Sequence, residues 1–290
     1  MAIIIDGKKV AAEIKNELAA EVQVLKTRGI VPKLALLLVG SDPASEVYVR
    51  NKHKFCIDIG IESLQVQKDA SITEDEVLAI VNEWNNDPTV SGILVQLPLP
   101  KHINETKVLL SINPMKDVDG FHPENVGRLV AGLPTYVPCT PLGIWELLKR
   151  YEIDLSGKHV VVVGRSNIVG KPIANLLVQK QPNANAIVTI CHTAAPDLSH
   201  YTKDADVLIA AVGVPELIKA KDVKDGVVVI DVGVNRINDS SKESGTRLVG
   251  DVAYEEVAPK ASAITPVPGG VGPMTIAMLI KNTLQSINRK

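Results

Sequence analysis

Residues 160–172 read VVVVGRSNIVGKP. Four consecutive valines, bounded by Gly157 and Gly164, predict a strand that is buried on both faces, as at the centre of a parallel sheet. A turn bracketed by Gly164 and Gly170 follows, and a helix is expected after it. The free backbone N–H groups of such a turn and the positive end of the helix suit a pyrophosphate, so the stretch predicts a dinucleotide-binding loop.

The spacing of this turn differs from the common G-x-G-x-x-G pattern. Gly164 and Gly170 are one residue further apart than the outer glycines of that pattern, and Ser166 stands in place of its middle glycine. A strand-to-helix turn that binds no ligand therefore stays open as an alternative, because a fold does not by itself fix a function.

Composition excludes several classes of protein. The 290 residues include 31 basic and 33 acidic side chains, a balance that gives no electrostatic footprint for nucleic acid. No apolar run has the length of a membrane span, and the N-terminus lacks the pattern of a secretory or transit signal, so we expect a cytoplasmic protein. Three cysteines without a C-x-x-C pattern predict neither disulfides nor a metal site. The expected partners are small molecules and further copies of the chain.

The length allows two domains, and the second half alternates strands with helical segments. Besides residues 160–163, strands are predicted at 186–191, 206–212 and 227–231. This alternation predicts right-handed βαβ units and a parallel sheet.

The first half contains a helix that carries candidate site residues. A buried strand is predicted at 33–40, and Asp42 with Pro43 then predicts a helix that ends at Gly60. Tyr48 and Lys52 stand four residues apart, which places both on one face of this helix. Two interpretations stay open: a ligand site close to the end of a buried strand, or a solvated face of charged residues.

Polar residues after the next predicted strand, at 90–97, are a second group of candidates. Gln96 either satisfies nearby backbone groups or points into a site. Asp117, Asp119 and His122 lie in one loop that could cap a helix, bind a metal or hold a substrate. Two alternating carboxylates without further ligands are a weak metal signal.

The residues after the second strand of the dinucleotide domain indicate which cofactor to expect. An NAD site usually has an acidic residue there, but this chain has His192 and Thr193 and no carboxylate before Asp197. Arg165 supplies a permanent cation within the glycine turn, which suits a 2′-phosphate. The sequence therefore favours NADP.

Six motifs, spread in order over almost the whole chain, resemble those of the bifunctional methylenetetrahydrofolate dehydrogenase/methenyltetrahydrofolate cyclohydrolase family. They are Tyr48-Val-Arg-Asn-Lys52, Ile93-Leu-Val-Gln-Leu-Pro-Leu-Pro100, Lys116-Asp-Val-Asp-Gly120, Pro138-Cys-Thr-Pro141, Gly164-Arg-Ser-Asn-Ile-Val-Gly170 and Pro266-Val-Pro-Gly-Gly-Val-Gly-Pro-Met-Thr275.

The resemblance implies a two-domain α/β protein with a cleft between its domains. Residues 1–138 would form a three-layer α/β folate-binding catalytic domain, with the C-terminal helix 274–290 packing back on it, and residues 139–273 an NADP-binding Rossmann domain with a parallel sheet. It further implies a homodimer built through the Rossmann domains and a role in one-carbon metabolism and purine biosynthesis. Two reactions are implied in one cleft: oxidation of methylenetetrahydrofolate with NADP, and hydrolysis of the product to 10-formyltetrahydrofolate.

The resemblance also implies a role for each site residue. Lys52 would transfer the proton in hydrolysis, Gln96 would hold and tune it, and Tyr48 would stack on the aminobenzoate ring. Asp119 would accept from the pterin, and the loop with Pro268, Gly269 and Gly270 would line the folate side of the cleft. The cofactor would be bound by Gly164, Arg165, Ser166, Ile168, Val169, Gly170, His192, Thr193, Val212, Gly213 and Gly233.

One departure and three alternatives accompany this resemblance. Many family members have Cys-His-Ser after the second strand, whereas this chain has Cys191-His-Thr193, whose hydroxyl can still donate to a phosphate. The alternatives are a dehydrogenase without cyclohydrolase activity, a different NAD(P)-dependent Rossmann oxidoreductase, and a dinucleotide-sensing regulator without turnover. Lys52, Gln96, Tyr48 and Asp119 together favour the bifunctional enzyme.

Overall fold

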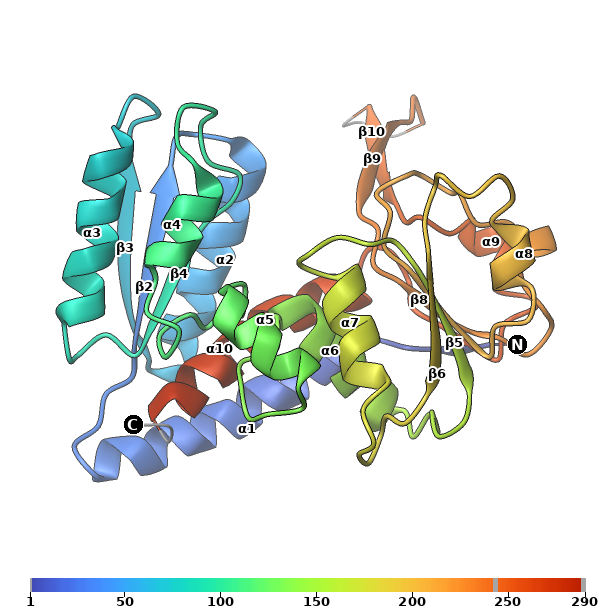
Figure 1. Ribbon diagram of the computed structural model, residues 1–290, viewed down its shortest axis with the longest axis horizontal. Coiled ribbons are helices and arrows are strands. Elements are labelled where there is room, and N and C mark those ends of the chain that lie inside the picture. Colours follow the sequence, from blue (N-terminus) through green and yellow to red (C-terminus); the bar gives the residue numbers. More distant parts are fainter. Residues whose placement is uncertain (1, 242–244, 288–290) are drawn as a thin grey trace. The chain divides into compact units, whose positions relative to one another are not determined.

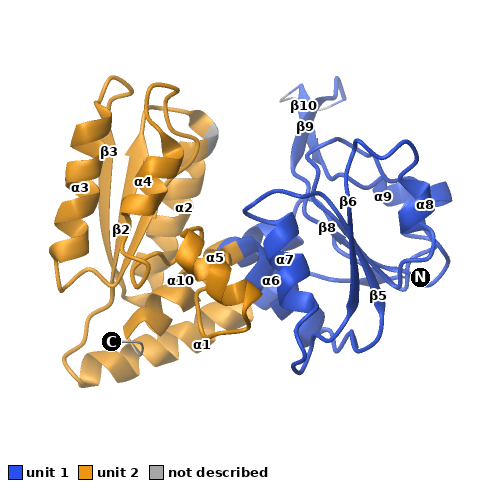
Figure 2. Cartoon of the chain, viewed as in Figure 1, with its two compact units in different colours: residues 1–11, 140–275 blue, residues 12–139, 276–290 orange. Residues whose placement is uncertain are grey.

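The computed structural model describes residues 2–241 and 245–287, which form two compact units (Figure 2). Unit 1 contains the described residues up to 11 and residues 140–275, and unit 2 contains residues 12–139 and 276–287. Residues 2–11, expected in the catalytic domain, lie in unit 1, where strand β1 (Ile3–Ile4) pairs with β11 (Ala263–Ile264).

Unit 1 is built on a six-stranded sheet in the order β1-β11-β8-β7-β5-β6, and all its strand pairs are parallel. The remaining strands are β5 (His159–Val163), β6 (Ile187–Cys191), β7 (Val207–Ala210) and β8 (Val228–Asp231). The four valines of β5 are fully buried, which confirms the prediction of a strand covered on both faces, although β5 lies beside the edge strand β6 and not at the centre of the sheet.

Short helices and a hairpin complete unit 1 (Figure 1). The helices are α6 (Cys139–Arg150), α7 (Gly170–Leu177), α8 (Ser199–Thr202), η1 (Ala220–Asp222) and α9 (Tyr254–Val257). Strands β9 (Asn235–Asn238) and β10 (Thr246–Val249) pair in antiparallel fashion. Residues 242–244, between these two strands, lie outside the described part of the chain.

Unit 2 has a three-stranded parallel sheet in the order β3-β2-β4, formed by Glu62–Lys68, Lys33–Val39 and Gly92–Val95. Its helices include α2 (Pro43–Ile59), α3 (Glu74–Asn86), α4 (Glu105–Ser111) and α5 (Pro123–Val130). Side chains of α3 and α4, such as Val81 and Val108, form one buried cluster with Leu37 and Ile93 of the sheet. Figure 1 shows α3 and α2 on opposite sides of this sheet, as the predicted three-layer arrangement requires.

Helices α1 (Gly7–Thr27) and α10 (Val271–Ile287) contribute residues to both units. Within unit 2, the Asn282 side-chain amide of α10 donates to the carbonyl oxygens of Val118 (2.8 Å) and Val137 (3.0 Å). These two bonds fix α10 beside the loop that carries Asp119.

Capping explains where the helix with the candidate residues begins and ends. The Asp42 carboxylate accepts from the Ser45 N–H (2.8 Å), and Pro43 occupies the first turn. Gly60 ends α2 with a φ of 84°, a left-handed conformation that favours glycine. Both predicted boundaries of this helix, which carries Tyr48 and Lys52, are confirmed.

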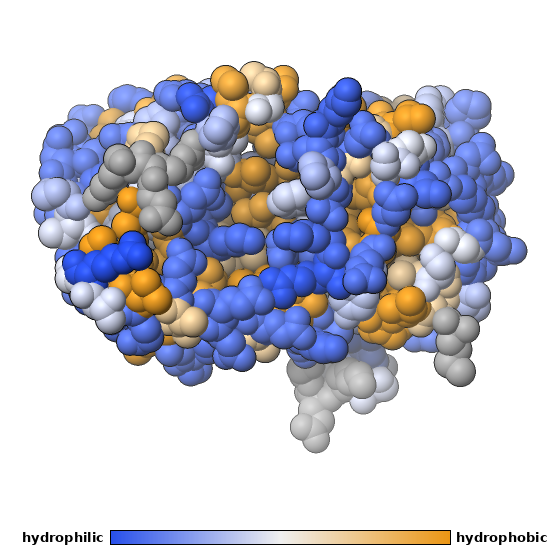
Figure 3. Space-filling model, turned by 90° about the horizontal axis from the view of Figure 1, so that it is seen from below, coloured by the Kyte–Doolittle hydropathy of each residue, from blue (hydrophilic) through white to orange (hydrophobic). Residues whose placement is uncertain are grey.

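The molecular surface is predominantly hydrophilic on the face shown in Figure 3, where apolar residues lie in small groups between polar ones. Within residues 2–241 and 245–287, no helix combines the length and the apolar character that crossing a bilayer requires.

Candidate functional site

In unit 2, Lys52 and Gln96 meet at the carboxyl edge of the sheet. Strand β2 lies between β3 and β4, so the connection from β2 to β3 and the connection from β3 to β4 run in opposite directions across the sheet. This arrangement places ligand sites at this edge. Lys52 is only 8% exposed, and its Nζ donates to Gln96 Oε1 at 2.9 Å. Lys54, on the same helix, has a side chain that is 73% exposed. The interpretation of Lys52 as part of a solvated face is therefore wrong.

Hydrogen bonds hold both the backbone and the side chain of Gln96. Its backbone N–H donates to the Leu37 carbonyl (2.8 Å), and its side-chain Nε2 donates to the Leu97 carbonyl (2.8 Å). Because the amide nitrogen has this partner, the amide oxygen faces Lys52. Gln96 thus both satisfies a backbone carbonyl and points into the site, where it orients the amine.

Asp119 joins this pair because its segment runs beside β4. The Ile93 N–H donates to the Lys116 carbonyl (2.8 Å), and Ile93 pairs with Asp117 in parallel register. Asp119 follows two residues later at the same edge. Burial raises the pKa of Asp119, whereas the Lys52 ammonium acts in the opposite direction, so the two groups interact electrostatically.

Tyr48 stands one turn before Lys52 on α2 and is 44% exposed. An aromatic ring that stays accessible beside a buried polar pair can stack on a planar ligand.

Asp117 and His122 stabilise the loop. The buried Asp117 carboxylate accepts from the His122 N–H (2.8 Å), the Asn125 side-chain amide (2.8 Å) and the Phe121 N–H (3.3 Å). His122 Nδ1 accepts from the Glu124 N–H (3.1 Å) and so caps α5. Of the predicted alternatives for this loop, helix capping applies to His122, and Asp119 remains the residue available to a ligand.

In unit 1, the glycine turn closes tightly at the point where the strand order reverses. Strand β5 has β6 on one side and β7 on the other, which defines the switch point of the sheet. Gly164 has a φ of 132°, and a Cβ there would collide with the Ala211 carbonyl at the end of β7. A Cβ on Gly170 would collide with the Gly164 carbonyl. The turn therefore requires glycine at both positions and forms a compact cradle.

Ser166 has a role that the sequence did not indicate. Its hydroxyl oxygen accepts from the N–H groups of Val169 (3.1 Å) and Gly170 (3.2 Å). Two of the N–H groups expected to be free for a pyrophosphate are therefore capped by the chain itself. Arg165 and Ile168, in the same turn, are exposed and accessible to a ligand.

The residues after β6 are arranged around a cavity. His192 Nδ1 accepts from the Ala194 N–H (3.3 Å), which orients the imidazole, and Thr193 is exposed. Thr193 lines a cavity of about 340 Å³ together with residues that include Lys219 and Lys221. The same lining includes the carboxylates of Asp197 and Asp222, which balance the two cations.

Val212, Gly213 and Gly233 are organised by two buried carboxylates that sequence reasoning missed. Asp251 accepts from the Val212 N–H (2.7 Å) and the Gly213 N–H (2.9 Å). Asp231 accepts from the Gly233 N–H at 3.0 Å. The sequence signal for Asp231 was its position at the end of the predicted strand 227–231. A carboxylate that ends a buried strand needs buried hydrogen-bond donors.

The loop with Pro268, Gly269 and Gly270 packs on the start of α1 within unit 1. The Gly269 carbonyl accepts from the Lys8 N–H (3.0 Å), and the Gly270 N–H donates to the Pro266 carbonyl (2.8 Å). A Cβ on Gly270 would contact the Pro266 carbonyl at 2.7 Å, so the loop requires glycine there.

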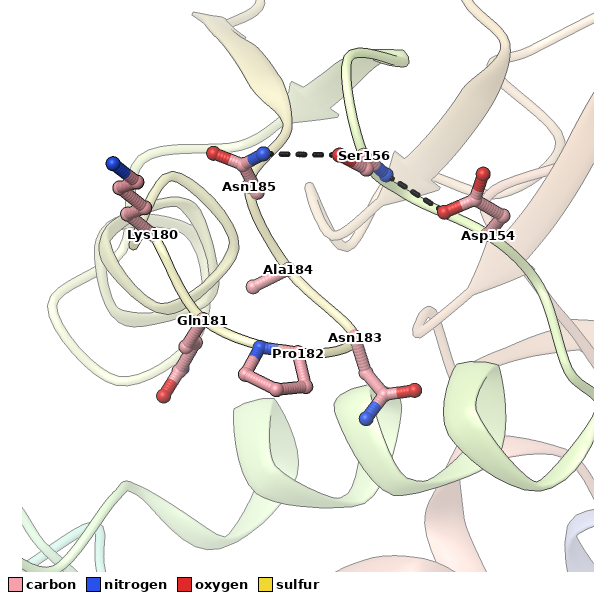
Figure 4. Close-up of a pocket in the computed structure, with 8 residues that line it drawn as sticks. All are labelled: Asp154, Ser156, Lys180, Gln181, Pro182, Asn183, Ala184 and Asn185. Carbon is pink, nitrogen blue, oxygen red and sulfur yellow. Dashed lines mark hydrogen bonds between the residues drawn. The ribbon is translucent and has the colours of Figure 1, made fainter.

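A second cavity of unit 1, of about 370 Å³, lies away from all these residues (Figure 4). Its lining residues, 154, 156 and 180–185, precede β5 and β6, so it belongs to the amino edge of the sheet. The Asn185 side-chain amide donates to the Ser156 hydroxyl (2.9 Å), and the Ser156 N–H donates to Asp154 (3.0 Å). Ligands of open parallel sheets bind at the carboxyl edge, so this cavity is not the cofactor site.

Comparisons with known proteins show which family the chain belongs to. Residues 5–119 match the family model of the tetrahydrofolate dehydrogenase/cyclohydrolase catalytic domain, and residues 138–290 match that of the corresponding NAD(P)-binding domain. The chain therefore belongs to the tetrahydrofolate dehydrogenase/cyclohydrolase family.

Individual relatives cover the chain almost completely. The bifunctional protein FolD of Chlorobium chlorochromatii is 59% identical over 290 residues, which are 99% of this chain and 98% of the relative. The crystal structure of the bifunctional FolD enzyme from Campylobacter jejuni has 52% identity and a TM-score of 0.94, with 100% of each chain covered. The Trypanosoma brucei enzyme, solved with NADP cofactor and inhibitor, has 40% identity and a TM-score of 0.93, with 99% of this chain and 98% of that chain covered.

The buried carboxyl of Asp231 predicts a pH dependence of stability. Burial, with the neighbouring Asp251 carboxylate, raises the pKa of Asp231 to about 7, although three backbone N–H groups lower it. Between its ordinary value of 3.8 and this value, the folded protein retains a proton that the unfolded chain has lost. The contribution to stability is therefore complete below about pH 4 and is lost as the pH rises through about 7.

Urea unfolding of the wild type and of Asp231→Asn, at about pH 5 and about pH 8, measures this contribution. The wild type should lose more unfolding free energy over that interval than the variant, whose amide does not titrate. Asp225→Asn, at an exposed carboxylate, should behave like the wild type. An equal pH dependence of wild type and Asp231→Asn would contradict the raised pKa.

Proposed function

We propose that the chain oxidises 5,10-methylenetetrahydrofolate with NADP and hydrolyses the resulting 5,10-methenyltetrahydrofolate to 10-formyltetrahydrofolate. The observation that carries this proposal is the buried Lys52 amine, held by Gln96 at 2.9 Å beside Asp119. A buried amine with an oriented partner is a group that can move a proton, and hydrolysis needs such a group. Family membership supplies the two substrates to which this chemistry applies.

Lys52 would act on the water that attacks the methenyl carbon. Its nitrogen, as the amine, takes the proton of that water, and as the ammonium it returns a proton when the ring opens. Gln96 accepts one hydrogen of Nζ and so fixes the direction of the remaining positions on nitrogen. Because Gln96 is itself held by Leu37 and Leu97, this orientation exists before the substrate binds.

Tyr48 and Asp119 would hold the folate. The exposed ring of Tyr48 offers a stacking surface for the aminobenzoate ring, one turn from Lys52. The Asp119 carboxylate would accept from two parallel N–H donors of the pterin, an arrangement that binds and orients at once. In unit 1, we assign the rigid loop of Pro268, Gly269 and Gly270 to the folate as well.

The glycine turn and its neighbours fit NADP. A Cβ on Gly164 or Gly170 would collide with neighbouring backbone carbonyls, so the turn stays compact, and Arg165 lies exposed in it. Arg165, His192 and Thr193 would hold the 2′-phosphate, and Ser166, Ile168, Val169, Val212, Gly213 and Gly233 would form the rest of the cofactor site. When bound, NADP accepts a hydride from the folate. The chain's part in that step is placement, because a substrate nitrogen supplies the electron pair that drives hydride departure.

We also propose that the protein acts in the cytoplasm as a homodimer built through unit 1. Strand β6 is an edge of the six-stranded sheet and exposes Ile187 (64%) and Ile190. An exposed apolar edge strand is a surface that a second copy can cover.

Replacing Lys52 tests the hydrolytic role. Lys52→Met keeps the length of the side chain and removes the proton-transfer group, so we expect methenyltetrahydrofolate hydrolysis to fall by about 100-fold or more. Dehydrogenation, followed as NADPH formation, should be retained. Lys54→Met, at an exposed lysine of the same helix, should leave both activities unchanged. If Lys52→Met hydrolysed as fast as Lys54→Met, the assigned role would be wrong.

Replacing Arg165 tests cofactor discrimination. Arg165→Ala removes a charged contact to the 2′-phosphate, so KM for NADP should rise by about tenfold or more. KM for NAD, which lacks this phosphate, should change little. An equal rise for both cofactors would place Arg165 elsewhere on the dinucleotide.

The oligomeric state can be measured by light scattering after gel filtration. We expect twice the mass of one chain for the wild type and a shift toward the single chain for Ile187→Lys, which puts a charge on the exposed edge. A wild type that elutes with the mass of one chain would contradict the proposed dimer.

A further inference from the structure

Asp251 is a fully buried carboxylate in unit 1, located two residues after β10. Its Oδ2 accepts from the N–H groups of Val212 (2.7 Å) and Gly213 (2.9 Å), and its Oδ1 accepts from the Asn235 side-chain amide (2.8 Å). All three donors are neutral groups of the chain. The carboxylate therefore joins the segment after β7 to the first residue of β9.

The surroundings of Asp251 hold it in one place. Its own N–H donates to Asp231 Oδ1 (2.9 Å), and its carbonyl accepts from the Ile218 N–H (3.0 Å). Gly233, at the carboxyl end of β8, lies so close that a Cβ there would collide with the Asp251 side chain. Backbone hydrogen bonds and the close contact with Gly233 thus hold Asp251 in place, so its carboxylate is an acceptor with a fixed position.

The segment that Asp251 holds lies at the switch point of the sheet. Val212 follows Ala211, whose carbonyl is the atom that a Cβ on Gly164 would strike. A movement of this segment would therefore disturb the glycine turn after β5 as well. Without the carboxylate, the N–H groups of Val212 and Gly213 would lose their acceptor, and the backbone would move to find others.

We propose that Asp251 is a positioning residue for NADP, which clamps the ends of β7 and β8 so that the cofactor meets a preformed edge of the sheet. This inference rests on the proposed function, because it concerns the site assigned there to NADP. Asp251 lies behind the residues expected to touch the cofactor and acts through Val212, Gly213 and Gly233.

Calorimetric titration of the purified full-length protein with NADP tests the clamp. Asp251→Ala removes all three bonds, so we expect Kd for NADP to rise by about tenfold or more. In Asp251→Asn, the amide oxygen can still accept from Val212 and Gly213, and its NH₂ group can donate to Asn235 after that side chain turns. This variant should bind NADP within about threefold of the wild type. Asp225→Ala, at an exposed carboxylate of the same unit, is the matched control and should bind like the wild type.

A second readout separates the clamp from a general structural role. Hydrolysis of methenyltetrahydrofolate, measured without NADP, depends on Lys52 and Gln96 of unit 2 and should stay within about twofold in Asp251→Ala. Loss of both NADP binding and hydrolysis would contradict the proposal, as would unchanged NADP binding in Asp251→Ala or equal losses in Asp251→Ala and Asp251→Asn. If Asp251→Ala does not fold, Asn235→Ala decides: weaker NADP binding supports the clamp, and unchanged binding contradicts it. A wild type that does not bind NADP would instead refute the proposed function.

Discussion

Parallel strand pairing is the constraint on which both units depend. Parallel strands need crossover connections, so every strand of one sheet ends at the same edge, and the chain leaves that edge through turns. In unit 2 this brings Gln96 after β4 and Lys52 of α2 to one edge, and in unit 1 it brings Gly164 after β5 next to Ala211 after β7. Residues separated by more than forty positions thus become neighbours without any local sequence signal that relates them.

Buried polar groups at these edges are satisfied by neutral partners. Lys52 has Gln96, Asp251 has two N–H groups and an amide, and Asp231 has three N–H groups. A buried charge with an incomplete set of partners would either neutralise or destabilise the fold. Each of these groups has a fixed position, and fixed positions at the carboxyl edges are what a folate site and a dinucleotide site require.

The sequence predicted those parts of the fold that depend on local patterns. The buried valines of β5, the start of α2 at Asp42, its end at Gly60 and the turn between Gly164 and Gly170 are all as expected. Strand β3 was missed because Glu62–Lys68 is a largely exposed edge strand with only two apolar residues, Leu64 and Val66. Ser166 was interpreted as a substitution for a glycine. Its hydroxyl in fact caps the start of α7, where the N-cap residue Val169 provides no side-chain hydrogen bond.

The residues of the candidate site also fall into two groups, those that sequence motifs indicated and those that only the structure shows. Motifs indicated Lys52, Gln96 and Asp119, because their neighbours in sequence carry the resemblance. Asp251 stands after a single glycine and belongs to no such pattern, and its importance depends on contacts with Val212, Gly213 and Asn235. Only the folded chain shows that these residues meet.

One measurement tests the central claim most directly: purified protein is supplied with methylenetetrahydrofolate and NADP, and NADPH and 10-formyltetrahydrofolate are quantified from the same reaction. Two activities in one chain predict that both products form, with 10-formyltetrahydrofolate appearing faster than methenyltetrahydrofolate hydrolyses in buffer. NADPH without accelerated hydrolysis would mean that Lys52 and Gln96 do not form a hydrolytic site. The absence of both products would contradict the enzymatic function altogether.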